Sequence, residues 1–321
     1  MPIRVLRTAQ GRDLRRDSSS RRASEVVMDE IAPGPVPSPG EQRWLHEANA
    51  EAAIFFRQEL LWTTAAWPAA LLRAWGVEEV LDPGAGWQIG YAPDSGTQLL
   101  DHLQKKGFGR EPLMRAGLMS WTDDGLVVDR YRDQLVLVSR DQRLDPVGFV
   151  GIDRDGKARM LTPETPVHRQ SEALVGVLEQ IDVLEAGATA VIVDHPLDAI
   201  AIAIDLAARH SRDKSYVGIP LLGSAVSNAQ AQILRQYSAT NRVIVTVLDD
   251  LTAAERAVDN ALDLTFFFDR VRLLQRPPEP LLANPGRLEL LADLHVAKPP
   301  NSPNSGSQHH SPGIEDLGPE L

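Results

Sequence analysis

The sequence predicts an α/β fold in which an α+β half is followed by a parallel, Rossmann-like sheet. Residues 190–193 are apolar and mostly β-branched, which suits a buried strand, and Pro196 suits the first turn of a helix. Residues 241–257 repeat the pattern of strand, acidic turn and helix. The stretch between the two units has room for one further strand and helix. Strands that alternate with helices indicate a parallel sheet.

Composition narrows the class of protein. The chain has 321 residues, a formal net charge of −11 and no cysteine. The lack of cysteine excludes disulfides and cysteine-ligated zinc. The sequence has no apolar run as long as a membrane span and no signal peptide, so we expect a cytoplasmic protein without membrane contact. The negative charge argues against broad attraction to nucleic acid but leaves room for a local basic groove.

Four regions differ in composition. Residues 1–41 are rich in Arg, Ser and Pro, and we expect them to form a disordered basic arm. Residues 42–178 carry the patterns of the α+β half, and residues 179–296 carry those of the parallel sheet. Residues 297–321 lack core-forming side chains, and we expect a disordered tail.

Apolar periodicity predicts the elements of the first half. The expected helices cover 41–62, 68–76, 97–107 and 114–118, and the expected strands cover 87–93, 126–139 and 147–152. Residues 153–156, with the sequence Asp-Arg-Asp-Gly, predict a tight turn. They do not form a calcium loop, because the downstream acidic ligands are missing.

Carboxylates follow two predicted strands of the parallel sheet. Asp194 and Asp198 follow the first of them, and Asp249 and Asp250 follow the second. The carboxyl ends of neighbouring parallel strands share one edge of a sheet, where sites form in open α/β folds. Clustered carboxylates repel one another unless they bind a hard cation, and Mg²⁺ prefers one or two carboxylates together with substrate phosphates. The cluster indicates phosphoryl chemistry; the alternative is that Asp194 only caps the helix.

Seven segments, in order along the chain, resemble the catalytic core of bacterial DnaG-type DNA primase. They are similar above all to primase-like Toprim proteins of actinobacterial plasmids and conjugative elements. The segments are IGYAP at 89–93, LMRAGL at 113–118, DRYRD at 129–133, LTPET at 161–165, VDHPLDAIA at 193–201, PLLGS at 220–224 and PLLANPG at 280–286. The resemblance covers about residues 44–296.

The resemblance implies an α+β subdomain followed by a Toprim domain that ends in a closing helix. It also implies the synthesis of short RNA primers on single-stranded DNA, in replication or plasmid transfer. The expected cofactor is Mg²⁺ or Mn²⁺, without zinc. The expected substrates are single-stranded DNA and ribonucleotides, and the expected protein partner is a helicase or a relaxase.

Site residues follow from the matching motifs. The resemblance implies that Asp194, Asp198 and Asp250 are catalytic and that Asp194, Asp249 and Asp250 hold the metal. It implies nucleic-acid or nucleotide binding by Arg130, Arg132, Arg169, Gly223 and Ser224. Arg130 and Arg132 are two residues apart, so we expect them to share one face of a strand. The alternative for these two arginines is a surface ion pair with Asp129 or Asp133.

Three departures from the family pattern lie at the metal site. Asp194 stands where the family has Glu, His195 where it has Gly, and Leu248 where it has the first Asp of an Asp-x-Asp motif. The shorter carboxylate moves a ligand by about 1 Å, and such a misplacement can cost on the order of 10²-fold in rate. Leu248 removes a ligand altogether.

These departures leave two hypotheses for function. The first is a primase-type nucleotidyltransferase with a degenerate metal site. The second is an inactive Toprim accessory protein that binds single-stranded DNA or a replication or transfer partner. A Toprim nuclease or topoisomerase is the weakest alternative, because nothing in the sequence resembles the strand-passage tyrosine domain.

Overall fold

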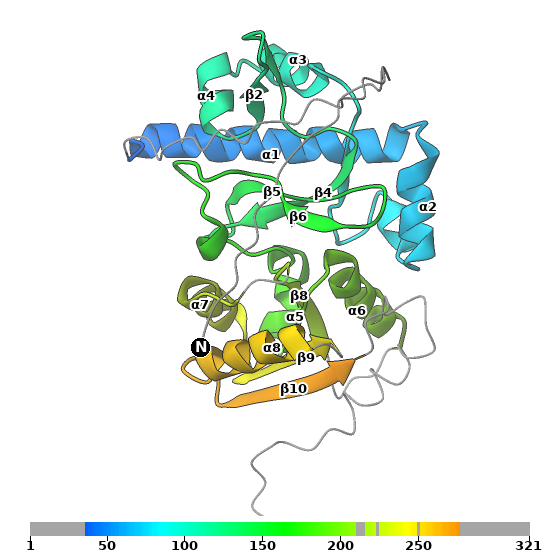
Figure 1. Ribbon diagram of the computed structural model, residues 1–321, viewed down its shortest axis with the longest axis vertical. Helices are drawn as coiled ribbons and strands as arrows, with labels where there is room; N and C mark the ends of the chain where they lie inside the picture. The colour runs from blue at the N-terminus through cyan, green and yellow to red at the C-terminus, as the bar shows by residue number, and fades with distance from the viewer. Residues whose placement is uncertain (1–35, 210–215, 223–224, 249–250, 277–321) are drawn as a thin grey trace, which may run out of the picture.

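The computed structural model describes residues 36–209, 216–222, 225–248 and 251–276 (Figure 1). The chain folds into two halves, each built on a four-stranded sheet. The long helix α1 (Pro39–Trp62) covers the first sheet, and the second sheet lies on the opposite side of the first one. No helix of this described part is long and apolar enough to span a membrane.

Helix α1 confirms the helix predicted over 41–62. It begins two residues earlier, inside the region expected to be disordered, because Ser38 caps it by accepting the backbone N–H of Glu41. Its buried face includes Leu45, Phe56 and Leu60. The helix lies very close to the first sheet, since a Cβ on Gly90 would stand only 2.6 Å from Cβ of Phe56.

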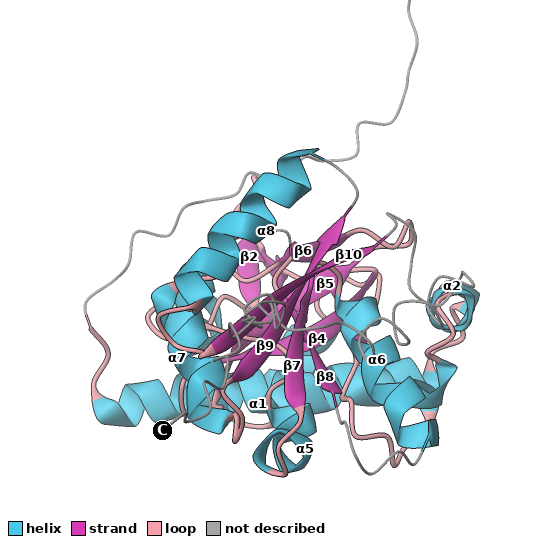
Figure 2. Cartoon of the chain, turned by 90° about the horizontal axis from the view of Figure 1, so that it is seen from below, coloured by secondary structure: helices cyan, strands magenta, loops and turns pink. Residues whose placement is uncertain are grey.

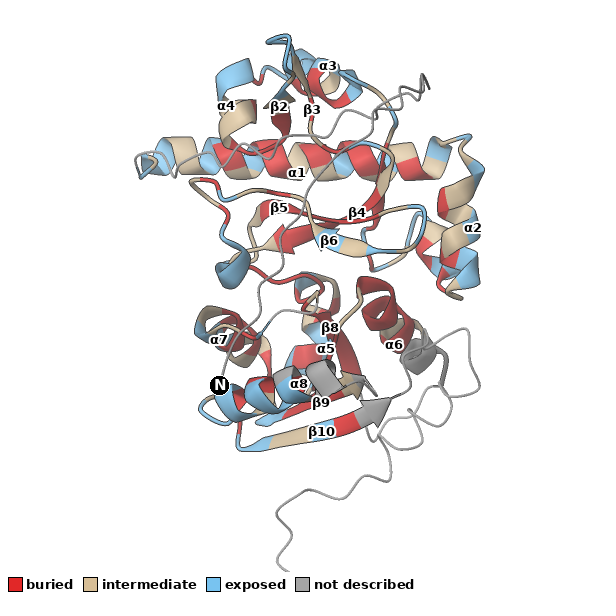
Figure 3. Cartoon of the chain, in the orientation of Figure 1, coloured by how far each residue is buried: buried red, intermediate tan, exposed pale blue. Residues whose placement is uncertain are grey.

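The first sheet is antiparallel, with strand order β1-β4-β5-β6. Its strands are β1 (Gly90–Ala92), β4 (Gln134–Arg140), β5 (Pro146–Ile152) and β6 (Ala158–Met160). Both faces of the sheet are covered, as the burial in Figure 3 shows. Val136, Val138 and Phe149 pack towards α1, whereas Leu135 and Leu137 belong to a cluster that extends into the second half.

Smaller elements surround this sheet. They are α2 (Ala66–Ala74), η1 (Glu78–Leu81), α3 (Gln98–Lys105), α4 (Arg110–Arg115), β2 (Met119–Trp121), β3 (Val127–Asp129) and η2 (Gln170–Glu172). The helix predicted over 114–118 is wrong in position. Helix α4 ends at Arg115, the left-handed Gly117 (φ 74°) turns the chain, and Met119 already begins β2.

The prediction of one strand over 126–139 is also wrong. The chain leaves β3 at Asp129 and enters β4 at Gln134, so Arg130 and Arg132 lie in a connection and not on a strand face. Asp133 has a positive φ of 52°, which no continuous strand permits. The buried ring of Tyr131 anchors the connection by donating a hydrogen bond to Gly117 O at 3.0 Å.

The second sheet is parallel, with strand order β10-β9-β7-β8. Its strands are β7 (Thr189–Val193), β8 (Tyr216–Pro220), β9 (Arg242–Leu248) and β10 (Arg270–Arg276). The helices of this half are α5 (Ile181–Glu185), α6 (Pro196–Arg209), α7 (Asn228–Tyr237) and α8 (Leu251–Leu264). The short 3-10 helix η3 (Leu178–Gln180) precedes α5 directly. The two predicted strand–turn–helix units and the strand and helix between them are confirmed. Strand β10 was not predicted. The expected closing helix lies outside the described residues.

Helix α6 forms the layer between the two sheets. Side chains on one face of the second sheet, such as Ala190 and Ile192, pack with α5, α7 and α8, whereas Val191 and Val193 on the other face pack with α6. Figure 2 shows α7 and α8 on one side of these strands and α6 on the other. The same cluster reaches Leu137 of the first sheet. The two halves therefore share one continuous core.

Candidate nucleic-acid and metal site

The carboxyl ends of β7 and β9 meet at one edge of the second sheet. The two strands are parallel neighbours, with Ile192 opposite Val245, and the Thr246 hydroxyl donates a hydrogen bond to Ile192 O at 2.9 Å. Asp194 follows β7 directly at this edge. The predicted juxtaposition of these two strand ends is confirmed. Asp249, Asp250, Gly223 and Ser224 lie outside the described residues.

Asp194 is half-buried, and within the described part of the chain its carboxylate makes no hydrogen bond. The hydrogen bonds contradict the alternative that Asp194 caps α6. His195 takes that position, because its Nδ1 accepts the N–H of Leu197 at 3.1 Å and its carbonyl accepts the N–H of Asp198 at 3.1 Å. Asp198 is 1% exposed in the first turn of α6.

His195 also contacts the first half of the molecule. Its ring stacks on Trp75, with ring centroids 4.3 Å apart and an interplanar angle of 18°. Its Nε2 lies 2.8 Å from the carbonyl oxygen of Gly156, in the turn between β5 and β6. These contacts of His195 were not predicted, because the family pattern identifies His195 only as a residue that replaces a glycine.

The two arginines of the β3–β4 connection differ in environment. Arg130 is half-buried, and its Nη2 donates to Met119 O at 3.1 Å, so its guanidinium supports the β2–β3 hairpin. Arg132 is exposed and, among the described residues, forms no salt bridge. Of the two, Arg132 is the more exposed, and its charge attracts the Asp129 carboxylate without forming a salt bridge in the described chain.

Asp133, the last residue of this connection, accepts hydrogen bonds from three side chains. Its Oδ2 accepts Arg154 Nε–H at 2.5 Å, and its Oδ1 accepts Trp67 Nε1–H at 2.9 Å and the Tyr91 hydroxyl at 3.1 Å. Burial acts to raise the pKa of Asp133, but these hydrogen bonds and the Arg154 charge outweigh it and lower the pKa. Asp133 therefore stays ionised and fixes the end of the connection.

Asp129 has a structural role at the other end of the connection. Its carboxylate accepts the backbone N–H groups of Leu99 and Leu100, both at 2.9 Å, at the start of α3. Burial raises its pKa to about 6, although the two backbone hydrogen bonds oppose the shift. Asp129 and Asp133 thus have other partners, and the described contacts include no ion pair between them and Arg130 or Arg132.

Two further groups of charged residues lie elsewhere. Arg169 is exposed, and its Nε lies 3.9 Å from Glu172 Oε1. His46, Asp141 and Asp145 are the three described residues whose side chains are grouped closely enough to hold a metal ion. His46 Nδ1 lies 3.3 Å from Asp145 Oδ2, and Asp141 Oδ1 accepts two backbone N–H groups within its turn, whereas His46 Nε2 is buried without a hydrogen-bond partner.

The first half matches a known family. Residues 77–180 match the family described as the DNA primase catalytic core, N-terminal domain. This segment belongs to that family. This chain is 31% identical to a DNA primase of Deinococcus radiodurans over 226 residues, which are 69% of this chain and 36% of that protein. It is 29% identical to a DNA primase of Synechococcus elongatus over 187 residues, which are 56% of this chain and 26% of that protein. The chain thus spans about a third of these relatives' length.

Solved structures are similar to both halves of this chain. A DnaG primase catalytic domain bound to single-stranded DNA has a TM-score of 0.66 at 23% identity, covering 82% of this chain and 84% of that one. The RNA polymerase domain of Mycobacterium tuberculosis DnaG has a TM-score of 0.64 at 25% identity, covering 80% and 84%. The fold is that of a DnaG catalytic core.

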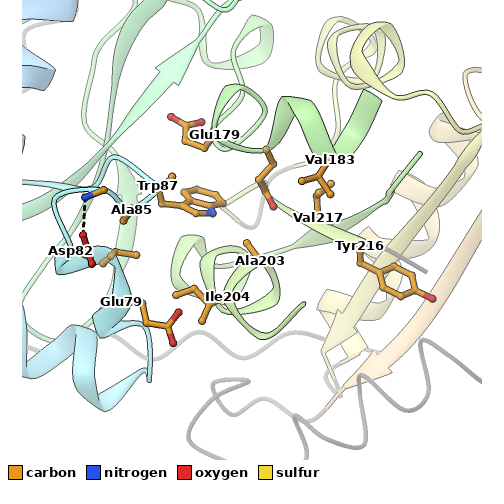
Figure 4. A pocket seen from close by; sticks show the side chains of 14 residues that line it. Glu79, Asp82, Ala85, Trp87, Glu179, Val183, Ala203, Ile204, Tyr216 and Val217 are labelled. Atoms are coloured by element: carbon orange, nitrogen blue, oxygen red, sulfur yellow. Dashed lines mark hydrogen bonds between the residues drawn. The ribbon is translucent and has the colours of Figure 1, made fainter. Parts of the chain in front are cut away.

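A cavity of about 880 Å³ lies where the two halves of the chain meet. Figure 4 shows Trp87 in its middle, with Glu79 and Asp82 on the side of the first half. The cavity reaches Tyr216 at the amino end of β8, whereas Asp194 follows the carboxyl end of the parallel strand β7. The cavity therefore belongs to the opposite edge of the sheet from the predicted metal site.

Proposed function

We propose that this chain is a primase-type nucleotidyltransferase that makes short RNA primers on single-stranded DNA. The observation that carries the proposal is that the ends of β7 and β9 meet at one edge, with Asp194 directly after β7, in a fold of the DnaG catalytic core. The family match of residues 77–180 supports the same assignment.

The described residues fit one part of a divalent metal site. Asp194 offers a half-buried carboxylate without a hydrogen-bond partner in the described chain, which is the kind of oxygen ligand that Mg²⁺ or Mn²⁺ takes. We propose Asp249 and Asp250 as the further ligands and Asp198 as a catalytic residue of the same edge. A divalent cation bound there supplies stabilisation of the charge that develops on the leaving group.

We assign the binding of template and nucleotide to Arg132, with Arg169, Gly223 and Ser224 as further contacts. Arg132 is exposed and free of described salt bridges, so it can bind a phosphate without first breaking an ion pair. Arg130 contributes charge to the same connection but is held by Met119 O. We also propose a helicase or relaxase as partner and a cytoplasmic location.

Primer synthesis by the full chain tests the proposal. Single-stranded DNA, four ribonucleotides and Mg²⁺ or Mn²⁺ are expected to give oligoribonucleotides, and the Asp194→Asn variant is expected to lose at least 10²-fold in rate. Asp123→Asn, which removes an exposed carboxylate from the β2–β3 turn, serves as a control and is expected to retain the wild-type rate.

The result that overturns the proposal is a folded wild-type chain that yields no oligonucleotide with either metal. Binding of single-stranded DNA that weakens with salt but ignores EDTA would then identify the chain as an inactive accessory protein.

A further inference from the structure

His195 contacts the first half through two groups and the start of α6 through a third. Its ring stacks on Trp75, its Nε2 lies 2.8 Å from Gly156 O, and its Nδ1 lies 3.1 Å from the backbone nitrogen of Leu197. A carbonyl oxygen only accepts hydrogen bonds, so Nε2 carries the hydrogen and Nδ1 accepts from Leu197. Both ring nitrogens and one ring face are therefore engaged.

The two first-half partners of His195 lie close to each other. Gly156 has a φ of +79°, and a Cβ built on it would stand 3.6 Å from Trp75 Nε1. Trp75 is the C-cap residue that follows α2, and Gly156 closes the turn between β5 and β6. The imidazole is thus bound by two separate elements of the first half, and a glycine at position 195 could make neither the stacking nor the Nε2 contact.

The turn that receives His195 is tied to the connection that bears the arginines. Arg154 lies in this turn, two residues before Gly156, and its Nε donates to Asp133 at 2.5 Å. Asp133 directly follows Arg132. At the other end of this series of contacts, His195 directly follows Asp194. Two hydrogen bonds, His195 to Gly156 and Arg154 to Asp133, therefore link the backbone next to Asp194 to the backbone next to Arg132.

We propose that His195 is a positioning residue that fixes the Asp194 carboxylate relative to the connection that bears Arg132. The identity of the ligands rests on the proposed function, in which Asp194 holds a divalent cation and Arg132 a phosphate. Because His195 is bonded to the first half and adjacent to Asp194 in sequence, movement of the Asp194 turn requires the loss of the stacking or the Gly156 hydrogen bond. His195 acts through Asp194 and does not itself touch the substrate.

The stacking of His195 on Trp75 is tested first, by its effect on stability. Urea unfolding of wild type, His195→Ala, Trp75→Ala and the double variant forms a double-mutant cycle. We expect the coupling between the two substitutions to change the unfolding equilibrium constant by at least three-fold. Additive effects of the two substitutions would overturn the interaction between these side chains and hence the proposal.

Metal affinity tests the positioning. Mn²⁺ titration of the full chain, followed by calorimetry, is expected to give about ten-fold weaker binding for His195→Ala. His195→Gln is expected to recover part of the affinity, because its side-chain amide N–H can still donate to Gly156 O. His102→Ala, which removes a half-buried imidazole between α3 and Glu51 of α1, is the matched control and is expected to bind Mn²⁺ as the wild type does.

Unchanged Mn²⁺ affinity in His195→Ala would overturn the positioning role, as would equal losses in the Ala and Gln variants. A wild-type chain that binds no Mn²⁺ would overturn the proposed function, and with it the role of His195 towards the metal. In that case the double-mutant cycle still shows whether His195 binds the two halves together, so the two failures are distinguishable.

Discussion

Arg140 and Glu179 form a buried pair at the junction of the two halves, with Arg140 Nε 3.7 Å from Glu179 Oε1. Their side chains are only 11% and 6% exposed. Burial raises the pKa of Glu179, and the charge of Arg140 opposes this shift. The pair is incompletely satisfied, because Glu179 Oε2 has no hydrogen-bond partner. It lies where the end of β4 pairs with Leu174, on the segment that leads into the second half.

Loss of Arg140 is expected to destabilise the fold strongly. Arg140→Ala leaves the Glu179 carboxyl buried without its cation, and breaking such a pair costs about 3–5 kcal/mol. The double variant Arg140→Met, Glu179→Leu removes both charges and is expected to recover more than half of that loss. Urea unfolding measures both variants. A double variant no more stable than Arg140→Ala would contradict this account of the pair.

The contact between α6 and β8 is expected to tolerate no added methyl group. A Cβ on Gly218 would stand 2.4 Å from Cα of Ala199, and neither backbone can move without disturbing the shared core. We expect Gly218→Ala to lower the free energy of unfolding by about 1–3 kcal/mol, as overpacking does. Gly96→Ala, with nothing within 4 Å of its Cβ, is the matched control and is expected to change stability by less than about 0.5 kcal/mol.

Asp129 is expected to make stability depend on pH in a defined window. Burial raises its pKa to about 6 in the folded chain, above the ordinary value of 3.8, so the folded state binds this proton more tightly than the unfolded state. Its contribution to stability is therefore fully present below about pH 4 and is lost as the pH rises to 6.

Comparison with Asp129→Asn isolates this effect, because in the folded chain both side chains are neutral at pH 4. Urea unfolding at pH 4, 5, 6 and 7 is expected to show the variant gaining stability relative to the wild type up to pH 6, with little change above. A difference that is constant with pH, or that changes in the opposite direction, would show that burial does not control this carboxyl.

Arg132 is expected to bind DNA, whereas Arg130 supports the fold. Arg132→Ala is predicted to weaken binding of single-stranded DNA and to reduce the slope of log K against log salt by about 0.7, the effect of one phosphate contact on a single strand. Arg43→Ala removes the same charge from the exposed face of α1 and is the control, since Arg43 is 79% exposed beside Glu47.

Fluorescence anisotropy at several salt concentrations measures both variants. An equal change in slope for Arg132→Ala and Arg43→Ala would mean that Arg132 acts only through net charge. Arg130→Ala is expected to lower thermal stability, because it deprives the Met119 carbonyl of its donor.

The local patterns in the sequence were sufficient where each element depends on its own residues. The apolar spacing of 41–62 predicted α1, and the β-branched runs predicted β7 and β9 as parallel neighbours whose carboxyl ends share one edge. They failed where a contact from elsewhere decides the path. The apolar residues of 126–139 are spaced as in one strand. The strand is interrupted because Asp129 accepts a hydrogen bond from the start of α3 and because Asp133, which binds Arg154, has a positive φ.

By itself, the sequence determined the α/β class, the order of the strand–turn–helix units and the identity of the acids that follow them, because these depend on periodicity over a few residues. Only the tertiary structure decided that His195, and not Asp194, caps α6, and that Arg130 is held while Arg132 is exposed. It also decided that Trp75 and Gly156 meet His195. The physical reason is that the Trp75 and Gly156 contacts, which orient the His195 ring, join residues 120 and 39 positions apart, and local spacing carries no information about which distant groups meet.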